Sequence, residues 1–157
     1  MKPDVKKTYD YVALAASAAR TSDGNGSAVQ LQGMVNAVAF VLDVTAAATD
    51  AGDLLDVYVQ TKADGTNWLD VLHFTQIAGT GGTKRYVAKI CAGGALTEFE
   101  NGTALSAGGV RHILGDDWRV RWEITDLDAS GDSGSAGDSG SGFSNASFTF
   151  GVTACPM

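Results

Sequence analysis

The fold is decided by the stretch Trp118-Arg119-Val120-Arg121-Trp122-Glu123-Ile124-Thr125, in which apolar and polar side chains alternate without a break. Side chains alternate between the two faces of a β-strand, so this stretch predicts a strand with one buried and one wet face. The alternation returns near the end of the sequence, where Phe148, Phe150 and Val152 are each followed by a small or polar residue. Two such strands around a Gly/Ser-rich loop predict a small antiparallel β-sandwich.

The rest of the sequence repeats this pattern of short strands and turns. Further strands are expected within residues 11–19, 28–32, 37–45, 55–61, 68–75 and 85–90, between clusters rich in Gly, Asp and Asn. Residues 11–19 are rich in alanine and could form a helix, but a strand fits better because every later element has strand character. We therefore predict an all-β fold, a single jelly-roll-like antiparallel β-sandwich of about eight strands with long Gly/Ser-rich loops.

Three segments stand apart from this pattern. Residues 1–10 are a polar arm in front of a single domain, residues 11–157. Residues 91–115 lack regular alternation and are expected to form an irregular surface excursion. Residues 126–142 are almost entirely Asp, Gly, Ser and Ala, so we expect an exposed, mobile loop.

The charge balance excludes several classes of partner. The formal net charge is -7, and an acidic surface repels phosphates, so we expect no nucleic-acid partner. No apolar run is long enough to cross a membrane, and we expect no membrane partner. The basic start is separated from a weakly apolar stretch by residues that include Asp10, which does not suit an export signal. We therefore expect a protein made in a cytoplasm.

The two cysteines, Cys91 and Cys155, fit no zinc-binding spacing. Without export, two free thiols are expected. A disulfide that ties the last strand to the strand ending near Ile90 is the alternative, because an exposed particle can meet oxidising surroundings.

The Asp-rich loop begins like a calcium-binding loop. Carboxylates and a glycine follow one another from Asp126 to Asp132 in the spacing that calcium loops use. The match then fails, because Gly137 stands where a bidentate glutamate is required. We expect no metal site.

No catalytic constellation is evident. His73 and His112 are far apart and have no Cys, Ser or acidic partner in a recognisable catalytic pattern. The adjacent carboxylates Asp116 and Asp117 are expected to form a turn at a strand start. We therefore expect a non-enzymatic protein with no catalytic residue and no cofactor. The tryptophans Trp68, Trp118 and Trp122 are expected in the core, with Trp68 partly exposed; a sugar-stacking platform is the alternative.

Several stretches together resemble small virion structural proteins of tailed bacteriophages. They are residues 18–31, 39–46, 55–71, 119–122 and 147–153, so the resemblance covers most of the chain from Val12 onward. The motifs are strand and turn preferences, and the long loops 91–115 and 126–142 depart from the compact pattern. The resemblance implies a β-sandwich or jelly-roll module of the particle. Proteins of this kind decorate the capsid as trimers, or lie at the head–tail junction or on the tail.

The expected function is therefore that of a capsid decoration (cement) protein, which binds and stabilises the assembled head without chemistry. It would be a virion component that forms a homotrimer and binds the major capsid protein. The alternatives are a head–tail junction or tail protein, and a carbohydrate-binding module for host recognition. The arm supplies the candidate interface residues, Lys6, Lys7, Tyr9 and Tyr11, which would order against a partner; a tail that contacts nothing is the alternative.

Overall fold

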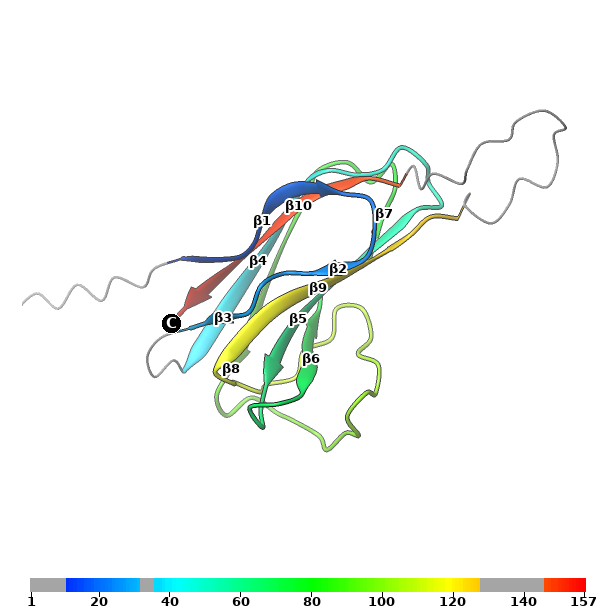
Figure 1. Ribbon diagram of the computed structural model, residues 1–157. Helices are drawn as coiled ribbons and strands as arrows, with labels where there is room; N and C mark the ends of the chain where they lie inside the picture. The colour runs from blue at the N-terminus through cyan, green and yellow to red at the C-terminus, as the bar shows by residue number, and fades with distance from the viewer. Residues whose placement is uncertain (1–10, 32–35, 128–145) are drawn as a thin grey trace, which may run out of the picture.

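The computed structural model describes residues 11–31, 36–127 and 146–157, whose strands form two antiparallel sheets (Figure 1). The strands are β1 Val12–Arg20, β2 Gly24–Asn25, β3 Val29–Gln30, β4 Ala37–Ala46, β5 Leu54–Lys62, β6 Trp68–His73, β7 Ile77–Ala78, β8 Lys84–Cys91, β9 Asp117–Thr125 and β10 Phe148–Pro156. Sheet A has the strand order β1-β10-β4-β8. Sheet B has the order β2-β9-β5-β6, and β3 and β7 pair with β9 and β5.

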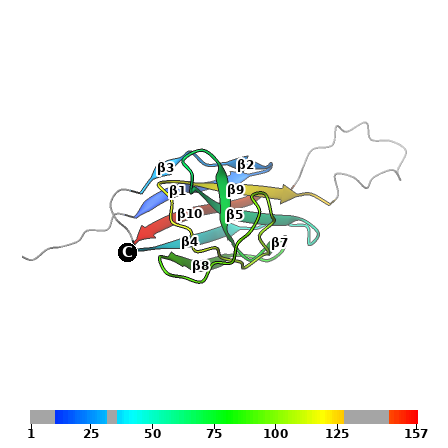
Figure 2. The same ribbon diagram turned by 90° about the horizontal axis from the view of Figure 1, so that it is seen from below.

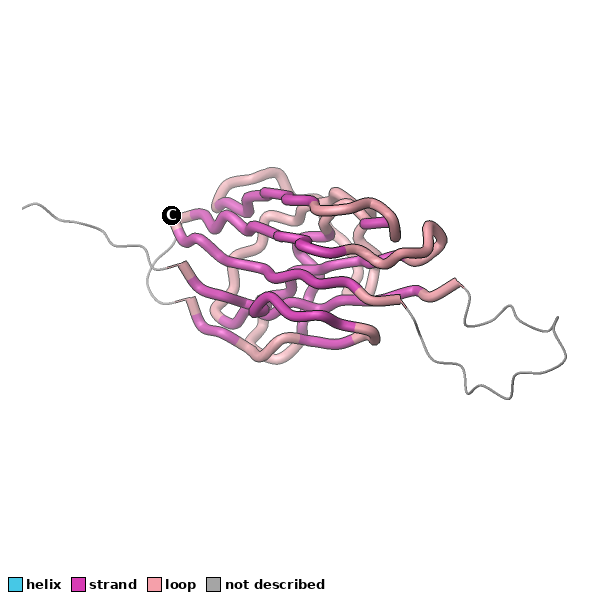
Figure 3. The backbone as a smooth tube through the Cα atoms, turned by 90° about the horizontal axis from the view of Figure 1, so that it is seen from above, coloured by secondary structure: helices cyan, strands magenta, loops and turns pink. Residues whose placement is uncertain are grey.

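The predicted all-β antiparallel sandwich is confirmed. The described residues contain no helix, as the colouring of Figure 3 shows. They contain ten strands, two more than predicted: β2 and β7 are each two residues long, pair only briefly with β9 and β5, and were not expected from the sequence. The jelly-roll connectivity stays a prediction.

The core lies between the inner faces of the two sheets. Trp118 and Val120 of β9 are fully buried, as are Phe148, Phe150 and Val152 of β10, which confirms both alternating strands. In β4 and β5 the predicted inner residues are also fully buried: Val38, Phe40, Leu42 and Val44, with Leu55, Val57, Val59 and Thr61. Replacing one buried aromatic side chain with alanine typically costs about 3–5 kcal/mol, so each of the buried aromatic residues of β4, β9 and β10 should contribute strongly to stability.

The alanine-rich segment forms a strand, β1. Small side chains suit this position, because β1 packs closely against β10. Consecutive residues Leu14 and Ala15 are both buried, and the pairing with β10 shifts register at this point, which marks a bulge. The bulge brings β1 so close to Gly151 that an added Cβ would lie 3.0 Å from the backbone nitrogen of Ser17. Tertiary packing therefore overrides the helical preference of alanine.

Trp122 departs from the expected core position. The ring is only partly buried and packs edge-on against Phe150, with ring centres 5.8 Å apart. Its Nε1 donates to the backbone carbonyl of Ser22 at 2.9 Å. An added Cβ on Gly24 would lie 2.5 Å from the indole, so only glycine lets β2 pass this close. Trp122 closes the sandwich beside β2 instead of filling its centre, whereas Trp68 is partly exposed as predicted.

Between β8 and β9 the chain is irregular, with one isolated bridge between Leu72 and Val110. Arg111 fastens it by donating to the backbone carbonyls of Asp70 at 3.0 Å and Thr103 at 2.9 Å. The arm and residues 128–145 lie outside the described residues, so the expected mobility of the Asp-rich loop stays a prediction.

Candidate functional site

The outer face of sheet B carries a network of polar and charged side chains. The amide of Gln60 donates to Asp70 Oδ1 at 2.8 Å, and its carbonyl accepts from Arg119 Nε at 2.7 Å. Arg121 donates to Asp70 Oδ2 at 3.1 Å and also binds Glu123. The strand register creates this network, because it sets Gln60 opposite both Arg119 and Asp70. Much of the hydrogen-bonding capacity of this face is therefore used within the chain.

Aromatic rings lie beneath the cations of this network. Arg121 Cζ is 3.9 Å from the ring centre of Tyr58. Lys62 Nζ and Arg119 Cζ lie 4.8 and 4.3 Å from the ring centre of Trp68. Burial acts to lower the pKa of Arg121, but two neighbouring carboxylates outweigh it and raise that pKa. A stacked sugar ring would have to compete with two cations for Trp68.

His73 has an acidic partner that the sequence did not reveal. Its Nε2 lies 2.8 Å from Asp56 Oδ1, its Nδ1 lies 2.8 Å from the carbonyl of Leu105, and its ring stacks on Tyr58. Both ring nitrogens face acceptors, so neither is left to take a proton from a nucleophile. His73 ties the excursion to β5 and β6 and forms no catalytic pair.

His112 lies beside Cys91, which is also a pairing absent from the sequence analysis. The sulfur is 3.7 Å from Nδ1, and the backbone N–H of Cys91 donates to the same nitrogen at 3.2 Å. Activation of the thiol would put a proton on Nδ1, where it would oppose that N–H. The pair therefore fixes the start of the excursion and does not favour a thiolate nucleophile.

The carboxylates form no metal centre within the described residues. No group of three or more His, Cys, Asp or Glu side chains there could hold an ion. Asp117 lies 3.6 Å from Lys62 Nζ, while Asp116 is exposed beside it at the start of β9. The calcium-like spacing that begins at Asp126 extends into residues outside the described ranges, so the expectation of no metal there stays a prediction.

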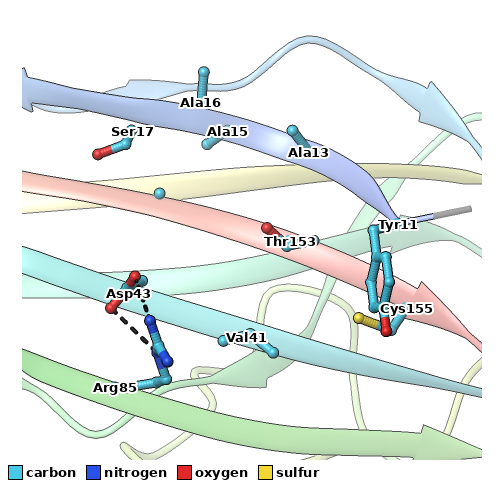
Figure 4. Close-up of a pocket in the computed structure, with 11 residues that line it drawn as sticks. Tyr11, Ala13, Ala15, Ala16, Ser17, Val41, Asp43, Arg85, Thr153 and Cys155 are labelled. Carbon is cyan, nitrogen blue, oxygen red and sulfur yellow. Dashed lines mark hydrogen bonds and ion pairs between the residues drawn. The ribbon is translucent and has the colours of Figure 1, made fainter.

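The outer face of sheet A differs sharply from that of sheet B. Its outward positions are mostly small and uncharged: Ala39, Val41, Asp43 and Thr45 on β4, and Thr149, Gly151, Thr153 and Cys155 on β10. A shallow groove of about 360 Å³ crosses this face between β1, β10, β4 and β8 (Figure 4). Asp43 and Arg85 form an ion pair at 2.9 Å on its floor. An antiparallel sheet that faces water normally carries polar side chains, so this face has the composition of a contact surface.

Tyr11 is the one predicted interface residue that the structure describes. It lines the groove near Cys155 (Figure 4), and 78% of its surface is exposed. Lys6, Lys7 and Tyr9 lie outside the described residues. Their role stays a prediction.

The two cysteines are both free, as expected, and the alternative disulfide is wrong. Cys155 lies on β10 and Cys91 on β8, and β4 separates these strands. Two strand spacings amount to about 10 Å, whereas a disulfide needs Cα atoms within about 7 Å. Burial raises the pKa of the Cys155 thiol, which further disfavours a reactive thiolate.

The sequence analysis missed the outer face of sheet A as a candidate site, although a signal was present. Ala39 and Val41 stand at the positions of β4 that alternate with its core residues, where polar side chains would be usual. Apolar residues on both faces of a strand indicate that both faces are covered, either by the chain itself or by a partner.

No protein-family model, curated protein or solved structure matches this chain. No helix long and apolar enough to cross a membrane is found in the part of the chain that the structure describes.

Proposed function

We propose that this protein is a non-enzymatic structural component of a tailed-phage virion, a decoration protein that binds and stabilises the assembled head. Several copies, as a homotrimer, would dock on the major capsid protein. The protein would be made in the host cytoplasm and end in the virion. The resemblance of its sequence to small virion proteins supports this proposal.

The observation that carries the proposal is the small, mostly uncharged outer face of sheet A. Four strands about 4.8 Å apart and about 30 Å long offer roughly 570 Å² of surface. A standard protein interface buries about 800 Å² on each partner. The face could therefore supply most of one interface, and an ordered arm that begins beside Tyr11 could supply the remainder.

Weak individual contacts are sufficient for such a role. Copies joined in a trimer bind a symmetric lattice together, and each bound copy raises the effective concentration of the others. The two histidines support a role without chemistry, since His73 has acceptors at both ring nitrogens and His112 already accepts a backbone N–H.

A matched pair of substitutions tests the docking face. Thr153→Glu puts a charge in the groove of sheet A, and Thr125→Glu puts the same charge on exposed sheet B. Both variants and the wild type would be sedimented with heads of the encoding phage that lack the protein. We expect Thr125→Glu to bind like the wild type and Thr153→Glu to bind at least about tenfold more weakly, which corresponds to 1.4 kcal/mol.

The alternative functions predict different results with the same virions and purified protein. Wild-type protein found on tails or at the neck by electron microscopy would replace the head assignment with the tail or head–tail one. Protein absent from purified virions would overturn every structural role. Glycan binding that is lost with Trp68→Ala would instead favour the carbohydrate-binding module, but the two cations over that ring do not support it.

A further inference from the structure

Strand β8 lies at the margin of sheet A (Figure 2), and no strand of the described residues pairs with its outer side. It pairs only with β4, over eight residues without a register shift. Just beyond β8, Ala92 N–H donates to Asn36 O at 2.7 Å, and this fixes which residues point toward β4. By the alternation of antiparallel pairs, Arg85, Val87 and Lys89 direct their N–H and C=O groups away from β4.

Two of the other margins, at β1 and β6, are protected. β1 is bulged, and Arg20 donates to the carbonyls of Ala16 and Ala18 at 2.8 and 3.0 Å. The free side of β6 is covered by the excursion, where Arg111 N–H donates to Val71 O at 2.7 Å. Proteins usually protect edge strands in such ways, so the long regular margin of β8 stands out.

The open margin has a defined end. The N–H of Cys91 donates to His112 Nδ1 at 3.2 Å, and its carbonyl accepts from Gly94 N–H at 3.2 Å. His112 and the turn at Gly94 therefore occupy the positions that an added strand would take beyond Lys89. An added strand would pair with Arg85, Val87 and Lys89 only.

A small pocket lies beside this margin, on the inner side of the sheet. It has a volume of about 140 Å³, and Leu72, Phe74, Tyr86 and Ala88 are among its lining residues. Alternate side chains of an added strand point to opposite faces, so those on its inner side would enter this pocket. The volume suits a small apolar side chain.

The charges on β8 select the partner. On the outer face Arg85 and Lys89 flank Val87, whose surface is 68% exposed. Arg85 is ion-paired with Asp43, so a partner carboxylate would share Arg85 with Asp43. In a symmetric pairing of two β8 strands centred on Val87, Arg85 of each copy would lie opposite Lys89 of the other, which is repulsive. The arm of a second copy would also bring like charges, at Lys6 and Lys7.

We propose that the margin of β8 accepts an extended segment of a partner protein as a fifth strand of sheet A. The segment has carboxylates opposite Arg85 and Lys89, a small residue opposite Val87, and small apolar residues between them that enter the pocket. Main-chain hydrogen bonds would supply affinity, and the carboxylates and the pocket would supply specificity. Only the identity of the partner, a head protein, rests on the proposed function.

A peptide tests the site without any virion component. The acetylated, amidated peptide Ser-Glu-Val-Thr-Val-Glu-Ser would be titrated into isotope-labelled protein, and binding would be followed by NMR. The control is the same peptide with both glutamates replaced by lysine. We expect shifts confined to β8 and the pocket, slower amide exchange at Arg85, Val87 and Lys89, and at least about tenfold weaker binding of the control. N-methylation of the central threonine should abolish binding, because it removes a donor to Val87.

Three variants separate strand addition from other modes of binding. Val87→Pro removes an N–H that β4 does not use, and should weaken binding at least about tenfold, whereas Val87→Thr keeps the N–H and should bind normally. Lys89→Glu should shift the preference toward the lysine peptide. Equal binding of both peptides, unchanged binding to Val87→Pro, or protection of these amides in the protein alone through self-association would overturn the proposal. Failure to bind heads with intact peptide binding would overturn only the proposed function.

Discussion

Arg20 should contribute far more to stability than its position near the surface suggests. Its guanidinium donates to the backbone carbonyls of Ala16 at 2.8 Å, Ala18 at 3.0 Å and Phe150 at 2.6 Å. Its Cζ also lies 4.2 Å from the ring centre of Phe150 and 4.6 Å from that of Trp122. One side chain thus joins the bulged end of β1, the neighbouring β10 and the indole that closes the sandwich.

The expected cost follows from these contacts. Each hydrogen bond to a partly exposed group contributes about 0.5–1.5 kcal/mol, and each ring contact about 0.5–1 kcal/mol. Water can replace some of the lost bonds at Ala16 and Ala18, so we expect Arg20→Ala to lower the free energy of unfolding by about 3 kcal/mol. Arg20→Lys keeps the charge but cannot reach all three carbonyls, so it should cost about half as much.

Urea unfolding followed by tryptophan fluorescence measures this difference, with the m-value as a check on two-state behaviour. Arg85→Ala is the matched control, because Arg85 is also an arginine of sheet A but is 68% exposed and bonds only to Asp43 among the described residues. That exposed ion pair is screened by water and should contribute little to stability. Equal losses for Arg20→Ala and Arg85→Ala would refute the bridging role of Arg20.

Three further results are expected. Trp122→Ala should lower the free energy of unfolding by about 3 kcal/mol in the same assay. Trp122→Phe should lower it by about 1 kcal/mol, because phenylalanine keeps ring contacts but loses the hydrogen bond to Ser22. A loss below about 1 kcal/mol for the alanine variant would show that the indole is not packed. The backbone N–H groups of Asn67 and Thr66 lower the pKa of Asp64 to about 2, so its stabilising effect is complete above pH of about 4 and is lost as the pH falls toward 2; an NMR titration midpoint near 4 would contradict this. Deletion of residues 1–10 should leave the melting temperature of the domain nearly unchanged while weakening trimer formation or head binding, and unaltered assembly would remove the arm from the interface.

The strands could be predicted from sequence because their signal is local. Alternation in β4, β5, β9 and β10 identifies the core residues without knowledge of the partner strand. The network on sheet B could not be predicted in this way, because Gln60 meets Arg119 only through the register between β5 and β9. The contact between Cys91 and His112 depends on the path of the irregular excursion, which has no periodicity to read.

The candidate docking face shows an intermediate case. The second apolar face of β4, at Ala39 and Val41, was visible in the sequence as a sign of covering on both sides. Only the structure shows that Val41 lines a groove on the outer face of sheet A. The open margin of β8 likewise depends on knowing which strands lie at the ends of each sheet.

The position of β10 has a consequence for how the chain folds. β10 lies between β1 and β4, and Val12 pairs with Ala154. The first described strand therefore cannot pair in its sheet until the last strand has been made. Closing so long a loop is slow compared with forming a hairpin such as β5–β6. During synthesis at about 5–20 residues per second, β1 therefore remains without its sheet partner until residues 148–156 have left the ribosome. The pairing of β1 and β4 with β10 should therefore form late, after Phe148 has been made, and a chain that stops before Phe148 should aggregate instead of forming a complete sandwich.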